Sequence, residues 1–337
     1  MTFQIQLDNS DVAFECKAGQ TILDAALQAG ISVPYSCRKG VCGNCAGQVT
    51  RGEVQPHGTL PLRNDTCSPA QVLYCGCEPA TDLRILPVSW QKMEDGAPKT
   101  YKVKVYRNER AAPDVSILQL RLPAGKKVKF RAGQYLLIRM EDGSTRCYSM
   151  ANPPHESDSL TLHIRHVPGG LFSSKVANLS SGDCLEVELP YGHVELQEED
   201  TRPLLFIAGG TGFAPVKSLL DSMAKKKVQR PITLLWGARE QSGLYMQAAV
   251  DKWKKAWPDF SYIPALDQVG PNPEGNCFAG RPDEAMANRF SSLQNHVVYV
   301  CGAPAMVEAI RTKALQLGAR PADIHADAFV TGPTNPQ

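Results

Sequence analysis

The arrangement of four cysteines in the first quarter of the chain restricts the fold more than any other feature of the sequence. They follow the spacing C-x4-C-x2-C-x29-C, in which four thiolates hold the two irons of a plant-type [2Fe–2S] cluster. The four residues are Cys37, Cys42, Cys45 and Cys75. Gly40 and Gly43 stand between them, where the absence of a Cβ lets backbone N–H groups approach the cluster sulfides. The spacing therefore predicts a loop that surrounds a [2Fe–2S] cluster.

Two questions about these cysteines stay open at the level of sequence. A four-cysteine zinc module is an alternative, but zinc ribbons usually pair two C-x2-C knuckles and only one is present here. Cys77 lies two residues beyond Cys75 and could compete with it as the fourth ligand, although the spacing favours Cys75. We expect Cys67 and Cys16 to be structural thiols. The chain has eleven cysteines, an odd number, and no secretion signal, which argues against a disulfide framework.

The composition excludes several classes of partner. The formal net charge of the 337 residues is +2, and Lys and Arg are spread without a basic block, so we expect no nucleic-acid binding. Residues 1–10 carry neither a basic start nor an apolar run, and no stretch approaches the roughly 18 apolar residues that a membrane span needs. We therefore expect a cytoplasmic monomer without membrane contact.

The first predicted domain covers residues 1–90 and contains the cysteine loop. Apolar residues alternate from Phe3 to Cys16, which is typical of a β-hairpin with its turn at Asn9. Thr21 then predicts a helix start, and Gly30 predicts its end. Residues 88–99 show little periodicity and predict an exposed linker.

Two further predicted domains follow this linker. Residues 98–199 contain short alternating runs broken by Gly and Pro, which predict a small antiparallel β-barrel. Residues 200–337 contain almost wholly apolar runs followed by helical patterns, and such runs mark strands buried on both faces of a parallel α/β sheet. The sequence therefore predicts a chain of three domains.

The second domain contains a flavin signature. Arg-Cys-Tyr-Ser at residues 146–149 matches the R-x-Y-S motif of the ferredoxin-NADP reductase superfamily, with Gly-Gln-Tyr before it at 133–135 and Ala-Asn-Pro after it at 151–153. This resemblance implies that Arg146 neutralises the flavin phosphate, Tyr148 stacks on the isoalloxazine and Ser149 reaches flavin N5. An Arg fork fits phosphate oxygens, and an aromatic face covers an aromatic ring. The alternative is a barrel strand with an ordinary exposed Arg and a half-buried Tyr.

A second phosphate-binding segment follows the signature. Arg165 and the run Gly-Gly-Leu-Phe-Ser at 169–173 stand where these reductases contact the flavin pyrophosphate, and backbone amides with a hydroxyl can receive that anion. The resemblance selects Gly169, Gly170 and Ser173, while Arg165 could also be a solvated strand residue. This second phosphate site favours FAD over FMN.

The third domain resembles the nicotinamide-binding part of the same superfamily. A glycine turn follows an apolar run and opens a helix, an arrangement that cradles a pyrophosphate. The turn consists of Gly209, Gly210, Thr211 and Gly212. The resemblance also implies that Cys301 and Gly302, at the end of a later apolar run, lie beside the nicotinamide. The alternative for Cys301 is a small buried thiol.

The end of the chain completes the resemblance. The segment Asp327-Ala328-Phe329 is similar to the acidic-x-aromatic segment that lies near the flavin in this family, where glutamate is frequent at the acidic position. Ser149, Cys301 and Asp327 are therefore the residues expected around the hydride path. Phe329 is expected among the cofactor-binding residues near the flavin.

Taken together, the chain resembles the ferredoxin-first NAD(P)H reductases, which include oxygenase reductase components and CDP-6-deoxyglucoseen reductase. The resemblance implies a β-grasp ferredoxin domain, a β-barrel FAD domain and an α/β NAD(P) domain. It also implies hydride transfer from NADH to FAD and single-electron transfer through the [2Fe–2S] cluster to an oxygenase, hydroxylase or deoxysugar dehydrase. NADPH is the alternative donor, because Arg239 could pair with a 2′-phosphate.

Two other functions are alternatives to a reductase that transfers electrons to a partner. A free-standing flavin or ferric reductase would not need the cysteine-containing domain. A redox-sensing module without turnover would need no rapid consumption of NADH.

Overall fold

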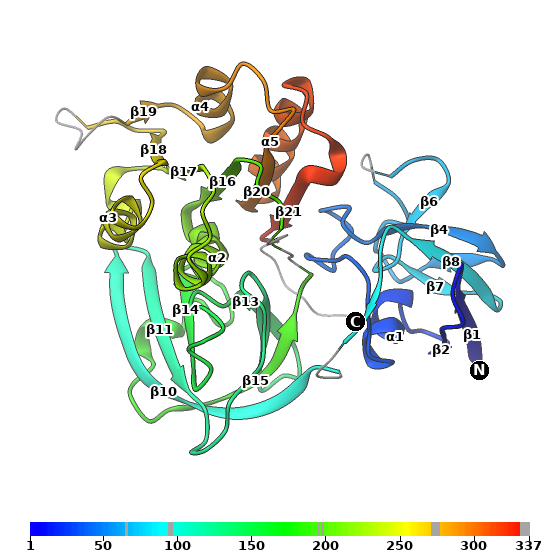
Figure 1. The fold of residues 1–337 in the computed structure, drawn as a ribbon. Helices are drawn as coiled ribbons and strands as arrows, with labels where there is room; N and C mark the ends of the chain where they lie inside the picture. Colours follow the sequence, from blue (N-terminus) through cyan, green and yellow to red (C-terminus); the bar gives the residue numbers. More distant parts are fainter. Residues whose placement is uncertain (65–66, 94–96, 194–195, 197–198, 271–276, 331–337) are drawn as a thin grey trace. The chain divides into compact units, whose positions relative to one another are not determined.

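The computed structural model describes residues 1–64, 67–93, 97–193, 196, 199–270 and 277–330. The chain forms two compact units (Figure 1). The first contains Met1–Lys99 together with Tyr191–His193, and the second contains Thr100–Pro190 and Val194–Gln337. No helix in the described part of the chain is long and apolar enough to cross a membrane.

The first unit has a β-grasp fold, as predicted. Its five-stranded sheet has the order β2-β1-β8-β4-β6, with β1 antiparallel to β2 and parallel to β8. The strands are β1 (Thr2–Leu7), β2 (Ala13–Lys17), β4 (Ala46–Arg51), β6 (Gln71–Leu73) and β8 (Leu83–Pro87). Ile5, Leu7 and Cys16 point into the core with no exposed surface, which is the alternation that the sequence predicted.

Helix α1 (Ile22–Gln28) packs on this sheet and has the predicted ends. The Thr21 side chain accepts a hydrogen bond of 3.0 Å from the backbone N–H of Asp24, and this bond satisfies a donor that the first turn leaves free. Gly30 lies just past the helix with φ +73°, a left-handed conformation that glycine adopts without strain.

The predicted linker contains a short strand. β9 (Gln91–Lys92) pairs antiparallel with β3 (Ile31–Ser32), and the Met93 N–H donates to Gly30 O. Periodicity could not reveal a two-residue strand, because its order comes from pairing with a distant segment. Part of the predicted linker lies outside the described residues. A second short pair joins β5 (Val54–Pro56) to β7 (Cys77–Pro79).

The first sheet of the second unit is a closed antiparallel barrel. Its order is β13-β12-β15-β10-β11-β14, and a bridge between Met150 and Leu162 connects the two edges. The strands are β10 (Lys99–Ala112), β11 (Val115–Arg121), β12 (Tyr135–Arg139), β13 (Thr145–Ser149), β14 (Ser159–Arg165) and β15 (Cys184–Tyr191), with a short 3-10 helix η1 (Val176–Asn178). Val105, Leu118 and Leu162 belong to its buried core.

The second sheet of this unit is wholly parallel. Its order is β19-β18-β17-β16-β20-β21, so the direction of strand addition reverses between β16 and β20. The strands are β16 (Leu204–Gly209), β17 (Ile232–Ala238), β18 (Phe260–Leu266), β19 (Phe278–Ala279), β20 (Val297–Gly302) and β21 (Ile324–Ala328). In open α/β sheets, ligands bind at the carboxyl ends of the strands where the order reverses. The topology therefore points to the ends of β16 and β20.

Helices cover both faces of the parallel sheet (Figure 1). Helices α2 (Phe213–Lys226) and α3 (Gln247–Ala256) contact each other, as do α4 (Pro282–Arg289) and α5 (Pro304–Gln316). Short 3-10 helices are η2 (Gly210–Gly212), η3 (Gln241–Gly243) and η4 (Pro321–Asp323).

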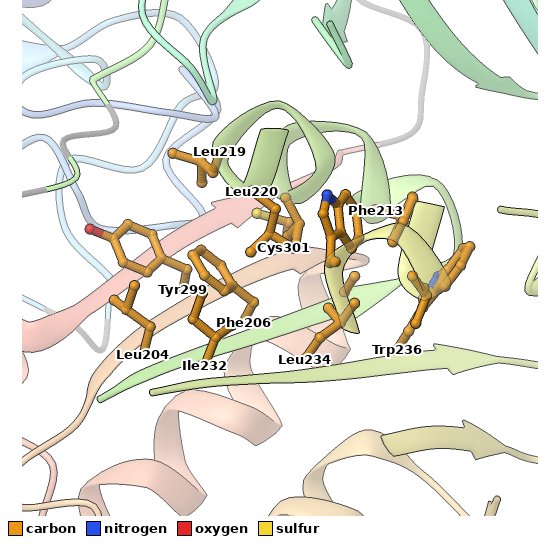
Figure 2. Close-up of a cluster of buried hydrophobic side chains, with 14 of the residues drawn as sticks. Leu204, Phe206, Phe213, Leu219, Leu220, Ile232, Leu234, Trp236, Tyr299 and Cys301 are labelled. Carbon is orange, nitrogen blue, oxygen red and sulfur yellow. The ribbon is translucent and has the colours of Figure 1, made fainter. Parts of the chain in front are cut away.

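Apolar side chains fix helix α2 on the sheet. Figure 2 shows Phe206, Leu234 and Tyr299 pointing from neighbouring strands toward the helix that carries Leu219 and Leu220. All five are at most 2% exposed, and full burial of a side chain of this size contributes about 1.5–3 kcal/mol. This packing holds the turn between β16 and α2 at the carboxyl end of the sheet.

Candidate cofactor sites

The four predicted cluster ligands lie in or beside one irregular loop of the first unit. The loop between β3 and β4 turns through left-handed backbone at Gly40 (φ +72°) and Gly43 (φ +75°). A Cβ at Gly40 would lie 2.5 Å from the Pro61 ring, so glycine is also required there by packing. Cys42, Cys45 and Cys75 are buried, and Cys37 is partly exposed.

The four thiols form two pairs. Cys37 hydrogen-bonds with Cys42, and Cys45 hydrogen-bonds with Cys75. In the described part of the chain, no three His, Cys, Asp or Glu side chains converge on one metal position. A structural zinc ion needs four ligands around one point, whereas each iron of a [2Fe–2S] cluster takes two thiolates. Two thiol pairs are the arrangement in which each pair could hold one iron of a [2Fe–2S] cluster.

The loop supplies several hydrogen-bond donors to the thiol of Cys37. The hydrogen bond from Cys42 lowers the pKa of Cys37 to about 6, and backbone N–H groups act in the same direction against the effect of burial. The N–H groups of Lys39 and Cys42 donate to Cys37 Sγ at 3.4 Å and 3.3 Å. Such amide donors also stabilise cluster sulfur atoms.

Cys77 has a different environment from Cys75. It lies on β7 with no exposed surface, and burial raises its pKa well above the usual range, with the charges of Cys75 and Cys16 as smaller causes. Burial likewise raises the pKa of Cys16 to about 12. The pKa values of the predicted ligands Cys42 and Cys45 are raised as well, by hydrogen bonds to Cys37 and Cys75 and then by burial, so a raised pKa does not distinguish structural thiols from ligands. The assignment of Cys75 as the fourth ligand stays a prediction.

The flavin signature lies on strand β13. Tyr148 pairs with Leu136 and Arg146 with Ile138 of β12, so Arg146 and Tyr148 share one face of the strand. The Tyr148 ring contacts Phe172 at a centroid distance of 5.6 Å, and burial raises the pKa of its hydroxyl. Ser149 is 8% exposed at the end of the strand.

The second phosphate segment forms a tight turn after β14. Gly169 has φ +74°, and a Cβ at Gly170 would lie 2.2 Å from Ser173 Oγ. The Val167 N–H donates to Ser173 Oγ at 3.3 Å. The turn thus has the small residues and the hydroxyl that an anion site needs.

Arg165 lies beside the glycine turn of the parallel sheet. A Cβ at Gly210 would be 2.7 Å from its Nη2, and its Nε is 3.3 Å from an Asp114 carboxylate oxygen. The sequence placed this Arg at the flavin pyrophosphate only. The structure places its guanidinium against Gly210, a proximity across 45 residues that spacing could not reveal.

Helix α2 is hydrogen-bonded to the segment that follows the flavin signature. Ser218 Oγ donates to Asn152 O at 2.8 Å, and Lys217 Nζ donates to Ala151 O at 3.4 Å. Ser218 is fully buried. These bonds fix the helix that starts at the glycine turn against the barrel that carries Tyr148.

The predicted nicotinamide residues meet at the carboxyl ends of β16, β20 and β21. Cys301 is directly opposite Asp327, and the Phe329 N–H donates to Gly302 O at 2.7 Å. A Cβ at Gly212 would lie 2.1 Å from Cys301 O. Burial, with a smaller effect of Asp327, raises the pKa of Cys301 well above its usual range. Cys301 is therefore an uncharged thiol.

The chain matches three protein families in succession. Residues 5–80 match the 2Fe-2S iron-sulfur cluster binding domain, residues 102–196 the oxidoreductase FAD-binding domain and residues 206–312 the oxidoreductase NAD-binding domain. The three families identify the cofactors as a [2Fe–2S] cluster, FAD and NAD(H).

Similar proteins cover the whole chain. Terephthalate 1,2-dioxygenase reductase component 2 of Comamonas sp. is 55% identical over 334 residues, which is 99% of both chains. The CDP-6-deoxy-L-threo-D-glycero-4-hexulose-3-dehydrase reductase of Yersinia pseudotuberculosis is 32% identical over 98% of this chain and 99% of its own. The crystal structure of the Amycolatopsis cytochrome P450 reductase GcoB has a TM-score of 0.80 and 30% identity, with coverage of 98% and 99%.

These matches agree with the fold described above. The full-length relatives named as reductases carry the cluster domain that a free-standing flavin reductase would not need. The chain therefore belongs to the ferredoxin-first NAD(P)H reductases of the ferredoxin-NADP reductase superfamily, and it is an iron-sulfur flavoprotein oxidoreductase that transfers electrons to a partner.

Proposed function

We propose that this chain is the NADH-dependent reductase component of an aromatic-ring dioxygenase of the terephthalate 1,2-dioxygenase type. The observation that supports this choice is the 55% identity, over 99% of both chains, to the two Comamonas terephthalate dioxygenase reductase components. The dehydrase reductase and the phenol hydroxylase P5 protein reach only 32% and 31%. We further propose a cytoplasmic monomer with domains at 1–90, 98–199 and 200–337.

When bound, FAD accepts a hydride and the cluster carries single electrons, so the flavin converts two-electron into one-electron chemistry. Arg146 is proposed to hold the flavin phosphate through its guanidinium fork, and Tyr148 is proposed to cover the ring. Gly169, Gly170 and Ser173 would receive the pyrophosphate at the turn after β14.

The residues around the nicotinamide are proposed to act by position. The raised pKa of Cys301 keeps its thiol neutral, so it would pack beside the nicotinamide and not act as a base. Asp327, opposite Cys301, would place a carboxylate at the same end of the sheet. NADH is proposed as the donor from the resemblance to the ferredoxin-first reductases, and NADPH, whose 2′-phosphate Arg239 could bind, is the alternative.

Replacing Cys301 with Ala is expected to slow flavin reduction by NADH about tenfold or more without loss of FAD, because misplacement of a reacting group by a fraction of an ångström is costly. Stopped-flow absorbance measures this rate. Arg146→Ala should instead loosen FAD, measured as flavin retained after gel filtration. The matched control is Cys184→Ala, which removes an exposed thiol of the same unit. If the rate of flavin reduction is unchanged in the Cys301→Ala protein, Cys301 is a buried structural thiol and has no role beside the nicotinamide.

The partner assignment is tested by reconstitution. The reductase is mixed with NADH, O2 and the purified oxygenase component of terephthalate 1,2-dioxygenase, and terephthalate-dependent O2 consumption is measured. We expect turnover at least about tenfold faster than with the oxygenase of phenol hydroxylase and phenol, because a specific interface discriminates by several kcal/mol. Equal or faster turnover with phenol hydroxylase would contradict the assignment.

A further inference from the structure

The glycine turn after β16 is enclosed by residues from three other parts of the second unit. Added Cβ atoms would lie 2.5 Å from Met306 Sδ at Gly209 and 2.7 Å from Arg165 Nη2 at Gly210. At Gly212, the added atom would lie 2.1 Å from Cys301 O. This crowding explains why side chains are excluded, but it does not determine which way the peptide groups of the turn face.

Trp236 makes a direct hydrogen bond to this turn. It is the partner of Ala208 in the parallel register of β16 and β17, so its side chain lies at the end of β16. Its Nε1–H donates to Gly210 O at 3.0 Å, and the residue has no exposed surface. The Phe213 ring stacks on the indole with a centroid distance of 3.8 Å and an interplanar angle of 11°.

The aromatic group around Trp236 extends to the barrel. Tyr245 meets the indole edge-on at 5.3 Å, and its hydroxyl hydrogen-bonds with Nδ1 of the buried His163 on β14 at 3.1 Å. His163 also stacks on Phe213 at 6.4 Å. The indole is therefore held by Phe213 and Tyr245, and both of these rings contact His163 of the barrel.

The hydrogen bond to Gly210 O has a consequence for the next peptide group. In a trans peptide, the C=O of Gly210 and the N–H of Thr211 point in opposite directions. Gly210 O accepts from the indole and from the Phe213 N–H, so it faces the core. The Thr211 N–H then faces away from the core, where a phosphate would find a donor. The opposite orientation would present a carbonyl oxygen to the anion.

The glycine at position 210 makes both orientations of the Gly210–Thr211 peptide accessible. Gly210 has φ +52°, and a residue without a Cβ adopts positive and negative φ with similar ease. Within the turn the Phe213 N–H opposes rotation of the Gly210–Thr211 peptide, and the indole N–H adds a second donor from outside the turn. A fixed donor on the core side selects the orientation that suits an anion.

We propose that Trp236 is a positioning residue for the nicotinamide dinucleotide: its indole N–H holds the Gly210–Thr211 peptide so that the Thr211 N–H faces the pyrophosphate. This inference rests on the proposed placement of the dinucleotide phosphates at the Gly209–Gly212 turn. Trp236 acts through the backbone and does not touch the substrate.

The test compares two buried tryptophans of the same core. Trp257 is 2% exposed, and its Nε1–H also donates to a backbone carbonyl, that of Val228, at 2.7 Å. Trp236→Phe and Trp257→Phe thus remove the same kind of bond, but only the first bond reaches the glycine turn. The readouts are the Kd of ADP-ribose, measured by calorimetry on protein loaded with FAD and cluster, the FAD content and the unfolding temperature.

We expect Trp236→Phe to raise the Kd of ADP-ribose about fivefold to tenfold, because that change corresponds to the loss of one hydrogen bond. The FAD content should stay unchanged. Trp257→Phe should lower the unfolding temperature but leave this Kd within about twofold. If Trp236→Phe does not fold, Phe213→Leu keeps the indole N–H and removes its stacking partner, and it should raise the Kd about twofold to threefold.

Two results would overturn the proposal. The first is a Kd of ADP-ribose that is the same in the wild type and in the Trp236→Phe or Phe213→Leu protein, or a Kd that rises equally in Trp257→Phe. Either outcome would show that Trp236 only stabilises the core. Failure of the wild-type protein to bind ADP-ribose would show that the dinucleotide phosphates do not lie at this turn. The binding measurement involves no oxygenase, so an error in the proposed partner would not affect it.

Discussion

Cys75→Ser protein is expected to lose nearly all of its [2Fe–2S] cluster. Cys75 completes the plant-type spacing, and in the structure it is the hydrogen-bonded partner of Cys45. A serine hydroxyl stays protonated where a thiolate is needed, because the thiolate is the form that binds metal. Iron and sulfide analysis, together with the visible spectrum, measures the loss. FAD content should stay at the wild-type level, since the flavin signature lies in the other unit.

Cys77→Ser is the matched control for this experiment. Cys77 lies two residues away on β7, outside the plant-type spacing that Cys75 completes, so it is expected to be a structural thiol. A buried hydroxyl without a partner costs about 1–3 kcal/mol, so the variant should unfold at a lower temperature but keep its iron. Loss of iron in Cys77→Ser with retention in Cys75→Ser would reassign the fourth ligand. Zinc in place of iron in anaerobically prepared wild-type protein would contradict the cluster itself.

The elements that could be predicted from the sequence are those whose signals are local. The hairpin of β1 and β2 and the ends of α1 follow from alternation, from the Thr21 cap and from Gly30, all within a few residues. Helix α5 has local signals at both ends too, because it begins at Pro304 and ends at Gln316, with Gly318 at φ +85° just beyond it. Local signals suffice here because caps and periodicity act within one turn or one strand.

The elements that were not predicted depend on distant pairing. β18 contains Pro264, which argues against a strand in the sequence, yet the residue pairs in register with Trp236 of β17. β21 contains the polar residues His325 and Asp327, so its sequence does not have the apolar pattern of a buried strand. It is an edge strand, and its hydrogen bonds with β20 stabilise it. In both segments, tertiary context overrides the local preference.

The candidate site likewise contains residues that could be predicted from the sequence and residues that could not. The cysteines, the R-x-Y-S signature and the glycine turn carry fixed spacings, so they could be found by inspection. The bond from Trp236 to Gly210 and the approach of Arg165 to the same turn join residues 26 and 45 positions apart. Nothing in the local sequence distinguishes Trp236 from an ordinary buried aromatic residue at a strand end. Only the packing of the two sheets shows which peptide group it fixes.

Removing residues 1–97 is expected to leave a folded, NADH-oxidising flavoprotein. The apolar cores of the barrel and of the parallel sheet consist of residues from Val103 onward, so the truncation removes none of their members. Tyr191–His193 group with the first unit, and the Gly192 N–H donates to Tyr35 Oη at 2.7 Å, so these three residues lose partners. A modest fall in the unfolding temperature is therefore expected.

The truncated protein should reduce ferricyanide at close to the full-length rate, because this acceptor takes electrons from the flavin. Its reduction of cytochrome c and of the proposed oxygenase partner should fall by at least about a hundredfold, since both are expected to draw electrons from the cluster and residues 5–80 match the cluster-binding domain. Full-length Cys75→Ser protein is the control, because it keeps the domain but lacks the cluster and should show the same loss. Retained partner turnover in both proteins would mean that electrons leave from FAD. Loss in the truncated protein alone would mean that the first domain serves to dock the partner and that the cluster is not on the electron path.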